Sequence, residues 1–167
     1  KYDLVAATDT SRLSDGVTIK IILTKIEADK VKSLVLCGGT SDCFVSFGNT
    51  AAVKDMAGNG ISAVAASAAV QASSFSKDIT PVSLTEFTKL DYNDGTLTLK
   101  FSEPVEPAQM AFDKITLAES FGISGVDTLV LTGGATDSPR GLEVVIKLKN
   151  TDLHKIKAKT WCKSITN

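Results

Sequence analysis

The feature that most constrains this chain is an internal repeat that relates its two ends. When the sequence is shifted by 125 positions, Gly16–Leu23 aligns with Gly141–Leu148 and Lys30–Lys32 aligns with Lys155–Lys157, without a gap. Eight of the 42 overlapping positions are identical, and apolar residues alternate in the same phase through the first stretch. Self-similarity at a fixed period is typical of repeat architectures, so we predict that the chain contains two copies of one unit.

The repeat divides the chain into two partial copies. Residues 1–80 are predicted to be the C-terminal part of one repeat, and residues 81–167 the N-terminal part of the next. The first copy lacks a counterpart of 81–125, and the second lacks a counterpart of 43–80. The two copies join at Pro81, which has no N–H for a strand ladder and suits a linker or the start of a strand. A period of about 125 residues is an ordinary domain size.

Short alternating stretches predict β-strands. Leu97, Leu99 and Phe101 alternate with polar residues, and Leu142–Leu148 is the cleanest strand of the chain. Asn93–Gly95 precedes the first of these strands and is a hairpin signal, because Asn, Asp and Gly tolerate positive φ. We expect Ser102–Val105 to break that strand. Further strands are predicted at 84–92, 115–117, 129–131, 44–47, 61–64 and 70–75, and turns at 55–60, 133–134 and 138–139.

One short helix is predicted after the cleanest strand, at residues 151–158. Asn150 or Thr151 could cap it, Leu153 and Ile156 give it one apolar edge, and His154 is expected to be solvated. Many short strands with one helical turn indicate an all-β chain. The predicted fold is a β-sandwich of Greek-key type.

Composition argues against several classes of function. Eighteen basic and 19 acidic residues leave a net charge of −1, which does not fit a general nucleic-acid binder. No apolar run approaches the ~20 residues of a transmembrane segment. One His and three Cys make a metalloenzyme a poor fit, and the serines lack a nucleophile elbow. Glu103 and Glu106 flank Pro104 like an acid/base pair, but a turn explains them better. We therefore expect no enzymatic activity.

The cysteines predict a disulfide. Cys37 and Cys43 flank a glycine-containing loop that can bring their Cα atoms to the ~5.5 Å of a disulfide. The alternative is a pair of free buried thiols. Cys162 is the repeat counterpart of Cys37, and the counterpart of Cys43 would fall at position 168, so truncation of the repeat explains the odd cysteine. A disulfide favours an extracellular or cell-surface protein.

Two groups of side chains could be interpreted as calcium sites. They are Asp91, Asn93 and Asp94 with Gly95, and Asp55, Asn59 and Asp78. The first group lacks the downstream Glu of an EF-hand and is better explained as a hairpin turn. In the second group, Asp55 and Asn59 are expected to bond the backbone of their own turn. The sequence therefore predicts no cofactor, with calcium as the alternative.

Two short motifs carry a resemblance to a known family. Leu99–Val105 reads Leu-Lys-Phe-Ser-Glu-Pro-Val and Asp55–Asn59 reads Asp-Met-Ala-Gly-Asn. Together they resemble the S-layer-type bacterial Ig-like domain. Its motif turns map onto Asp55, Gly58 and Asn59, and onto Ser102, Glu103 and Pro104. Asp152–Lys157 resembles a helix in versions of this repeat from large extracellular surface proteins of algae and other aquatic eukaryotes. The cysteines are an addition to the bacterial pattern.

The resemblance implies an extracellular protein of the kind found in surface layers, adhesins and large scaffold proteins. Its fold would be Ig-like Greek-key β-sandwich units in tandem, with one short helix per unit. We expect a structural, non-enzymatic segment of a large repeat protein that builds a surface layer, filament or appendage. Its partners would be neighbouring repeats or other copies. The alternative is an adhesin-type module for a glycan or a surface protein, and a third is an accessory domain of a secreted enzyme. Trp161 replaces Leu36 of the other copy and is expected in the core with most aromatic rings, which weakens the glycan reading.

The partial copies need strands from elsewhere, because an unpaired sheet edge and a bare apolar face invite association. The strands missing from 1–80 could belong to the same long polypeptide. They could come from a neighbouring chain, whose 81–125 would complete 1–80. Or 81–125 could fold back on 1–80 within one chain, leaving 126–167 as a surplus copy. The first source is favoured.

Overall fold

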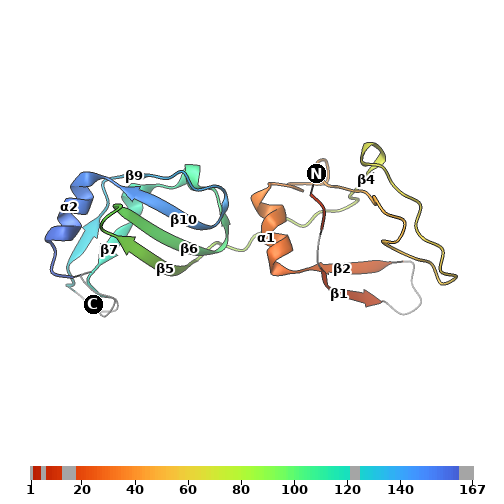
Figure 1. Ribbon diagram of the computed structural model, residues 1–167, viewed down its shortest axis with the longest axis horizontal. Coiled ribbons are helices and arrows are strands. Elements are labelled where there is room, and N and C mark those ends of the chain that lie inside the picture. Colours follow the sequence, from red (N-terminus) through yellow and green to blue (C-terminus); the bar gives the residue numbers. More distant parts are fainter. Residues whose placement is uncertain (1, 5–6, 13–17, 121–124, 162–167) are drawn as a thin grey trace. The chain divides into compact units, whose positions relative to one another are not determined.

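The structure, a computed structural model, describes residues 2–4, 7–12, 18–120 and 125–161 (Figure 1). The chain forms two compact units, Lys1–Thr80 and Pro81–Asn167, which divide where the repeat places the join. Strands hold 33% of the residues and helices 19%, so the prediction of a β-rich fold is confirmed.

The second unit contains two sheets and one α-helix. Its elements are β5 (Leu84–Asp91), β6 (Thr96–Val105), η2 (Pro107–Gln109), η3 (Phe112–Lys114), β7 (Thr116–Ala118), β8 (Thr128–Val130), β9 (Gly134–Ala135), β10 (Gly141–Leu148) and α2 (Asn150–Ala158). The larger sheet has the antiparallel order β5-β6-β10-β9, and β7 pairs with β8 in the smaller one. Strands β6 and β10, which are far apart in sequence, therefore lie side by side (Figure 1).

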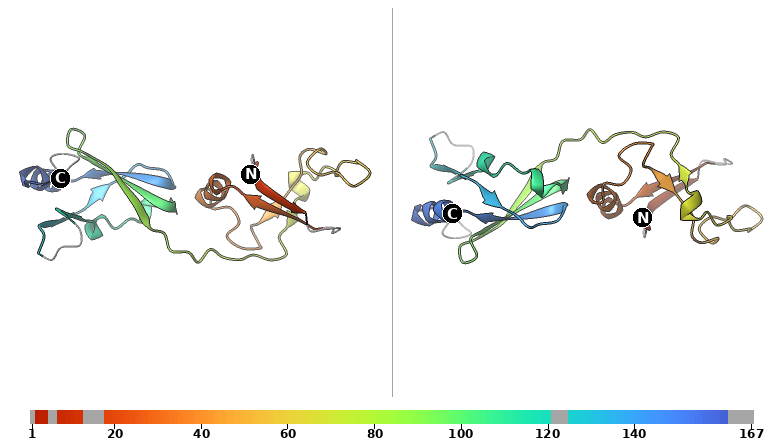
Figure 2. Two further views of the ribbon diagram at one scale, coloured as in Figure 1. Left: turned by 90° about the horizontal axis from the view of Figure 1, so that it is seen from below. Right: turned by 90° about the horizontal axis from the view of Figure 1, so that it is seen from above.

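Both sheets and the helix of the second unit contribute to one hydrophobic core. Figure 2 shows β7 and β8 to one side of the four-stranded sheet, with α2 at one end of the unit. The buried apolar residues are Leu97, Leu99, Leu117, Leu131, Val144, Ile146, Leu148, Leu153, Ile156 and Trp161. The alternation along β10 follows the predicted strand, because Val144, Ile146 and Leu148 are buried in this core and the residues between them are exposed.

Irregular pairing explains two features of the β5–β6 hairpin. Leu84, Phe87 and Leu90 are three residues apart because register shifts follow Leu84 and Phe87. The prediction that Ser102–Val105 breaks the strand is wrong, since β6 continues to Val105, which pairs with Gly141. The register shifts after Gly141, so Pro104 lies in a stretch where a missing N–H is tolerated.

The helix of the second unit differs from the prediction at its start. α2 begins at Asn150 rather than 151, its N-cap residue is Lys149, and no side chain caps it. Neither Asn150 nor Thr151 fills that role, because both already lie inside the first helical turn. The predicted apolar edge and the exposed position of His154 are both confirmed.

The first unit has the same kinds of element and almost no core. Its elements are β1 (Ala7–Arg12), β2 (Ile19–Leu23), α1 (Lys25–Ser33), β3 (Phe44–Val45), η1 (Ala66–Ala68) and β4 (Val70–Gln71). Among the strands of the described residues, β1 pairs only with β2, and β3 only with β4. Of the predicted strand at 61–64, only Val64 forms a bridge, to Phe47, and the strand at 70–75 shortens to two residues. Glu27 is the only buried residue among those described in this unit.

The two units contain a strand followed by a helix at the same spacing in the sequence. α1 and α2 are nine residues long and start at Lys25 and Asn150, a spacing of 125 residues. Each follows directly on a strand, and the β9 partner of β10 occupies the sequence position of β1. The strand and the helix therefore agree in type and spacing, whereas the predicted match of the loop after the helix falls on 162–167, outside the described residues. The pairing differs by one residue, since Thr10 faces Ile21 whereas its counterpart Ala135 faces Lys147.

Candidate functional site

A buried acid occupies the same position of both helices. Asp152 is 0% exposed and Glu27, 125 residues earlier, is 5% exposed. The Asp152 carboxylate accepts hydrogen bonds from the Thr132 backbone N–H at 2.7 Å and from its hydroxyl at 3.1 Å. Glu27 accepts one from the Tyr2 hydroxyl, which raises the pKa of Tyr2, and its Oε2 has no partner among the described residues. Each acid thus lies in the first turn of its helix.

A second carboxylate fastens the end of α2 to the loop before β8. Asp127 accepts hydrogen bonds from Lys159 Nζ at 2.6 Å and from Trp161 Nε1 at 2.9 Å. The Lys159 bond and then the Trp161 bond lower the pKa of Asp127. Trp161 is 3% exposed, so the prediction that this ring belongs to the core is confirmed.

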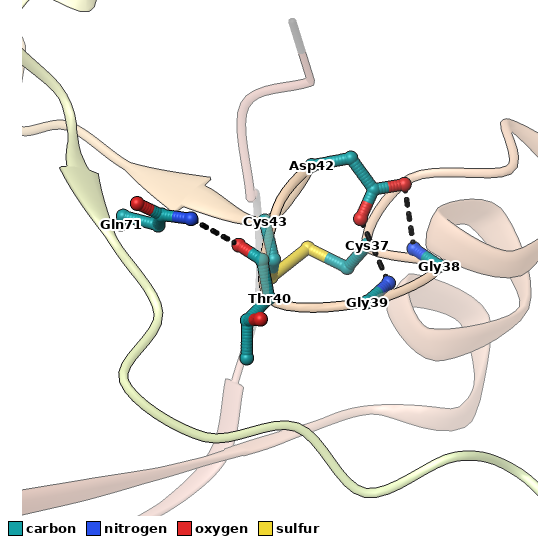
Figure 3. The surroundings of a disulfide bond; sticks show 7 residues. All are labelled: Cys37, Gly38, Gly39, Thr40, Asp42, Cys43 and Gln71. Atoms are coloured by element: carbon teal, nitrogen blue, oxygen red, sulfur yellow. Dashed lines mark hydrogen bonds between the residues drawn. A yellow bond between two sulfur atoms is a disulfide. The ribbon is translucent and has the colours of Figure 1, made fainter.

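The loop from Cys37 to Cys43 is closed by a disulfide (Figure 3). The two Sγ atoms lie 2.15 Å apart, as the spacing predicts, and the alternative of two free thiols does not hold. Within the loop, the Asp42 carboxylate accepts hydrogen bonds from the backbone N–H groups of Gly39 and Gly38 at 2.7 and 3.0 Å. These bonds lower the pKa of Asp42. Cys162 lies outside the described residues.

The loop is also attached to β4. Gln71 Nε2 donates a hydrogen bond to the Thr40 carbonyl at 3.0 Å (Figure 3). The backbone N–H of Ala72 reaches the Cys43 carbonyl at 2.8 Å. The disulfide loop is thus held by its own acid and by a strand.

The motif turn at Asp55–Asn59 is closed by its own side chains. Asp55 Oδ1 accepts hydrogen bonds from the N–H groups of Ala57 and Asn59, and Oδ2 accepts one from Asn59 Nδ2 at 2.9 Å. The Asn59 side-chain and backbone bonds lower the pKa of Asp55. Gly58 has φ +88°, which a residue with a Cβ rarely adopts. The expectation for Asp55 holds, whereas Asn59 bonds the carboxylate and not the backbone.

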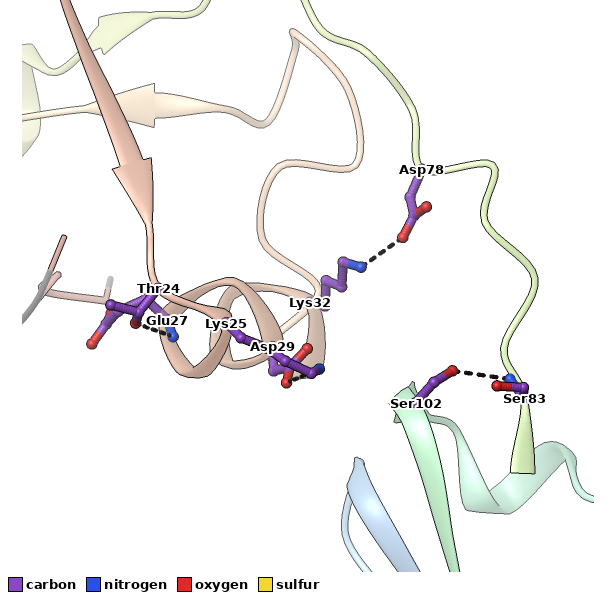
Figure 4. A network of polar contacts seen from close by, with 8 residues as sticks. All are labelled: Thr24, Lys25, Glu27, Asp29, Lys32, Asp78, Ser83 and Ser102. Carbon is purple, nitrogen blue, oxygen red and sulfur yellow. Dashed lines mark hydrogen bonds and ion pairs between the residues drawn. The ribbon is translucent and has the colours of Figure 1, made fainter. Parts of the chain in front are cut away.

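The other calcium candidates are likewise occupied by protein groups. Asp91 pairs with Lys89 at 2.7 Å and accepts hydrogen bonds from the N–H groups of Asn93 and Asp94. These contacts, Lys89 first, lower the pKa of Asp91 to about 2. Asp78 pairs with Lys32 at 2.7 Å (Figure 4). Among the described residues, no group of three or more His, Cys, Asp or Glu side chains could hold a metal ion.

Polar contacts hold the motif around Pro104. Glu106 forms an ion pair with Arg140. Ser102, in the same motif, accepts a hydrogen bond from the Ser83 backbone N–H at 3.0 Å and so ties the start of β5 to β6 (Figure 4). The motif residues of the second unit therefore take part in strand pairing.

The sequence reasoning expected a bare apolar face in the incomplete first unit but did not locate it, and the structure shows one on β2. Ile19 and Ile21 of β2 are 52% and 51% exposed, whereas their counterparts Val144 and Ile146 are 0% exposed. Phe44, on β3, is also exposed, contrary to the expectation that most aromatic rings face inward. The residue types predicted a core, but burial depends on strands that cover them. We take the apolar face of β2 as the candidate interaction site.

The pairing of β6 excludes one of the three predicted sources of the strands that the first unit lacks. β6 and β5 pair within the second unit, where β6 lies against β10. Residues 81–125 therefore do not fold back on 1–80, and residues 126–161 are not a surplus copy. The other two sources stay open.

No helix in the described part of the chain is both long enough and apolar enough to cross a membrane. Comparison with known proteins found no matching protein-family model, no matching curated protein and no matching solved structure.

Proposed function

We propose that this chain is a structural, non-enzymatic segment of a large extracellular repeat protein that builds a surface layer, a filament or an appendage. One observation carries the proposal: the same strand and helix recur at a spacing of 125 residues in two separate units. Repetition of a whole folding unit along a chain supplies length and repeated contact surfaces, which structural assemblies use.

The unit is assigned in this proposal to the S-layer-type bacterial Ig-like kind. Support comes from the two sheets that share one core in the second unit and from the placement of the two motifs. Ser102–Val105 lies in the central strand β6, and Asp55–Asn59 forms a self-capped turn. The disulfide between Cys37 and Cys43 supports an oxidising, extracellular location.

An antibody raised against this chain tests the proposal in the native source. We expect it to detect, in the extracellular or cell-surface fraction, a species many times larger than the 17.6 kDa of this chain. A cytosolic product, or one of about this size, would contradict the proposal.

The alternative is an adhesin-type module for a glycan or a surface protein. The observation in its favour is the exposure of three aromatic rings among the described residues: Phe44 at 53%, Phe87 at 45% and Phe75 at 39%. Glycan sites also use Trp, however, and Trp161 is buried. Binding of this chain to a glycan array, with loss in a Phe44→Ala variant, would favour the adhesin over the structural segment.

A further inference from the structure

Among the described residues, strand β2 pairs with one strand, whereas its counterpart β10 pairs with two. In the second unit, β10 pairs with β9 on one side and with β6 on the other. In the first unit, β2 pairs with β1, the positional counterpart of β9, and no other strand of the described residues pairs with its second edge. The correspondence at 125 residues therefore identifies the strand that would fit there, namely one like β6.

The side chains along β2 are those of a central strand. In β10, Val144 and Ile146 face Leu99 and Leu97 of β6 and are fully buried. Ile19 and Ile21 occupy the same positions of β2 and are half exposed. An apolar residue at every second position, next to an unpaired edge, is the surface to which an added strand binds.

We propose that the free edge of β2 is an acceptor site for a β-hairpin patterned like Leu84–Val105 and supplied by a further repeat unit. This inference rests on the proposed function, because only a repeat array offers such a hairpin beside each unit. The added hairpin would pair with β2 as β6 pairs with β10, and its apolar face would cover Ile19 and Ile21.

The donor is a further hairpin and not the β5–β6 hairpin of a second copy of this chain. Leu97 of β6 is 0% exposed and Leu99 is 7% exposed, because both lie in the core of the second unit. If this hairpin moved to another molecule, it would cover β2 there but leave β10 of its own molecule exposed. An exchange between two copies therefore leaves the number of uncovered strands unchanged.

The cross-strand neighbours indicate what the donor looks like. Positions opposite Ile19 and Ile21 take apolar residues, as Leu99 and Leu97 do opposite their counterparts. Lys20 replaces Val145, which faces Thr98 in the second unit. A polar or acidic residue opposite Lys20 is therefore preferred, because opposite charges across a strand pair attract.

A chimaera tests the site. Because Lys1 aligns with residue 126, a second copy of residues 81–125 can be joined directly ahead of Lys1 in the full chain. Relative to the unmodified chain, we expect the amides of Ile19, Ile21 and Leu23 to exchange hydrogen at least roughly tenfold more slowly. We also expect the fluorescence of 8-anilinonaphthalene-1-sulfonate, which binds exposed apolar surface, to fall. The matched control carries Leu97→Asp and Leu99→Asp in the added copy alone, and its β2 amides should exchange as in the unmodified chain.

A synthetic peptide of residues 81–106 provides a second arm, added in trans to the full chain. Protection of β2 in the chimaera or with the peptide, absent with the Asp variants, supports the site. If β2 is protected neither in the chimaera nor with the peptide, the acceptor site is refuted. It is also refuted if the unmodified chain forms a dimer in which β2 is already protected. A native protein that proves to be a large array while β2 stays unprotected would refute the site and leave the proposed function standing. Protection of β2, together with a native protein that proves small and cytosolic, would support the acceptor site and refute the proposed function.

Discussion

At the residue scale, the buried acid of α2 illustrates how one side chain joins a helix to a sheet connection. Asp152 is fully buried, and its hydrogen bonds to Thr132 hold the segment after β8 against the first turn of α2. A buried carboxylate is tolerated only when its oxygens find donors, and the Thr132 N–H and hydroxyl supply them.

Removal of this carboxylate should destabilise the second unit. Asp152→Ala deletes the acceptor for both Thr132 donors, so we expect the free energy of unfolding to fall by about 1–3 kcal/mol in urea denaturation. The control is Asp137→Ala, which removes a carboxylate that is 87% exposed and paired with Lys147. That change should stay within about 0.5 kcal/mol. If both variants lost the same free energy of unfolding, the buried carboxylate of Asp152 would stabilise the unit no more than an exposed one does.

The acid of the β5–β6 turn predicts a dependence of stability on pH. The pKa of Asp91 is lowered from 3.8 to about 2 in the folded chain, so its contribution is present above 3.8 and is lost as pH falls through about 2. Over that interval, the wild-type free energy of unfolding should fall more steeply than that of Asp91→Asn. Lys89→Gln should show an intermediate slope, because Lys89 is the main cause of the shift. Parallel curves for all three proteins would contradict this.

At the element scale, the disulfide loop depends on its covalent closure. Closing a loop this short removes roughly 2–3 kcal/mol of chain entropy from the unfolded ensemble. In a Cys37→Ser/Cys43→Ser variant, we expect the Gly38 and Gly39 amides, which bond Asp42, to exchange about tenfold faster or more. Exchange in β10 serves as the internal reference and should not change. An unchanged loop would show that the Asp42 hydrogen bonds alone hold it.

The elements also show where sequence reasoning succeeds. Alternation predicted β10 and the hairpin before it, because a strand with one buried face imposes a period of two on its residues. It could not predict that Ile19 and Ile21 are exposed, because the pattern along a strand records the burial it is suited to and not whether a covering strand is present. The continuation of β6 past Pro104 was not predicted for a related reason. The shift of register that accommodates Pro104 depends on Gly141, which is distant in the sequence.

The candidate site was predictable only in outline. The repeat indicated that residues 1–80 lack strands, but not which edge is open. That edge became clear from the pairing of β10 with β6, a contact between segments about 40 residues apart that leaves no local signal in either strand.

At the scale of the whole molecule, the two units should differ in stability. Every buried apolar residue of the described chain lies between Leu97 and Trp161, in the second unit. We therefore expect a single cooperative transition in thermal or urea unfolding, arising from the second unit, because burial of apolar surface is the main source of cooperativity. Fluorescence of Trp161 follows this transition. Two independent cooperative transitions of the isolated monomer would show that the first unit is complete by itself.

The disulfide between Cys37 and Cys43 also sets how far the first unit can be stretched. Six residue steps of open chain extend about 21 Å, at ~3.5 Å per residue. With the bridge intact, the two Cα atoms are held 4.2 Å apart, and tension passes through the sulfur atoms. Pulled from its ends, the oxidised chain is therefore about 17 Å shorter at full extension than the reduced chain. A redox change in the surroundings would lengthen each such unit without cutting the backbone.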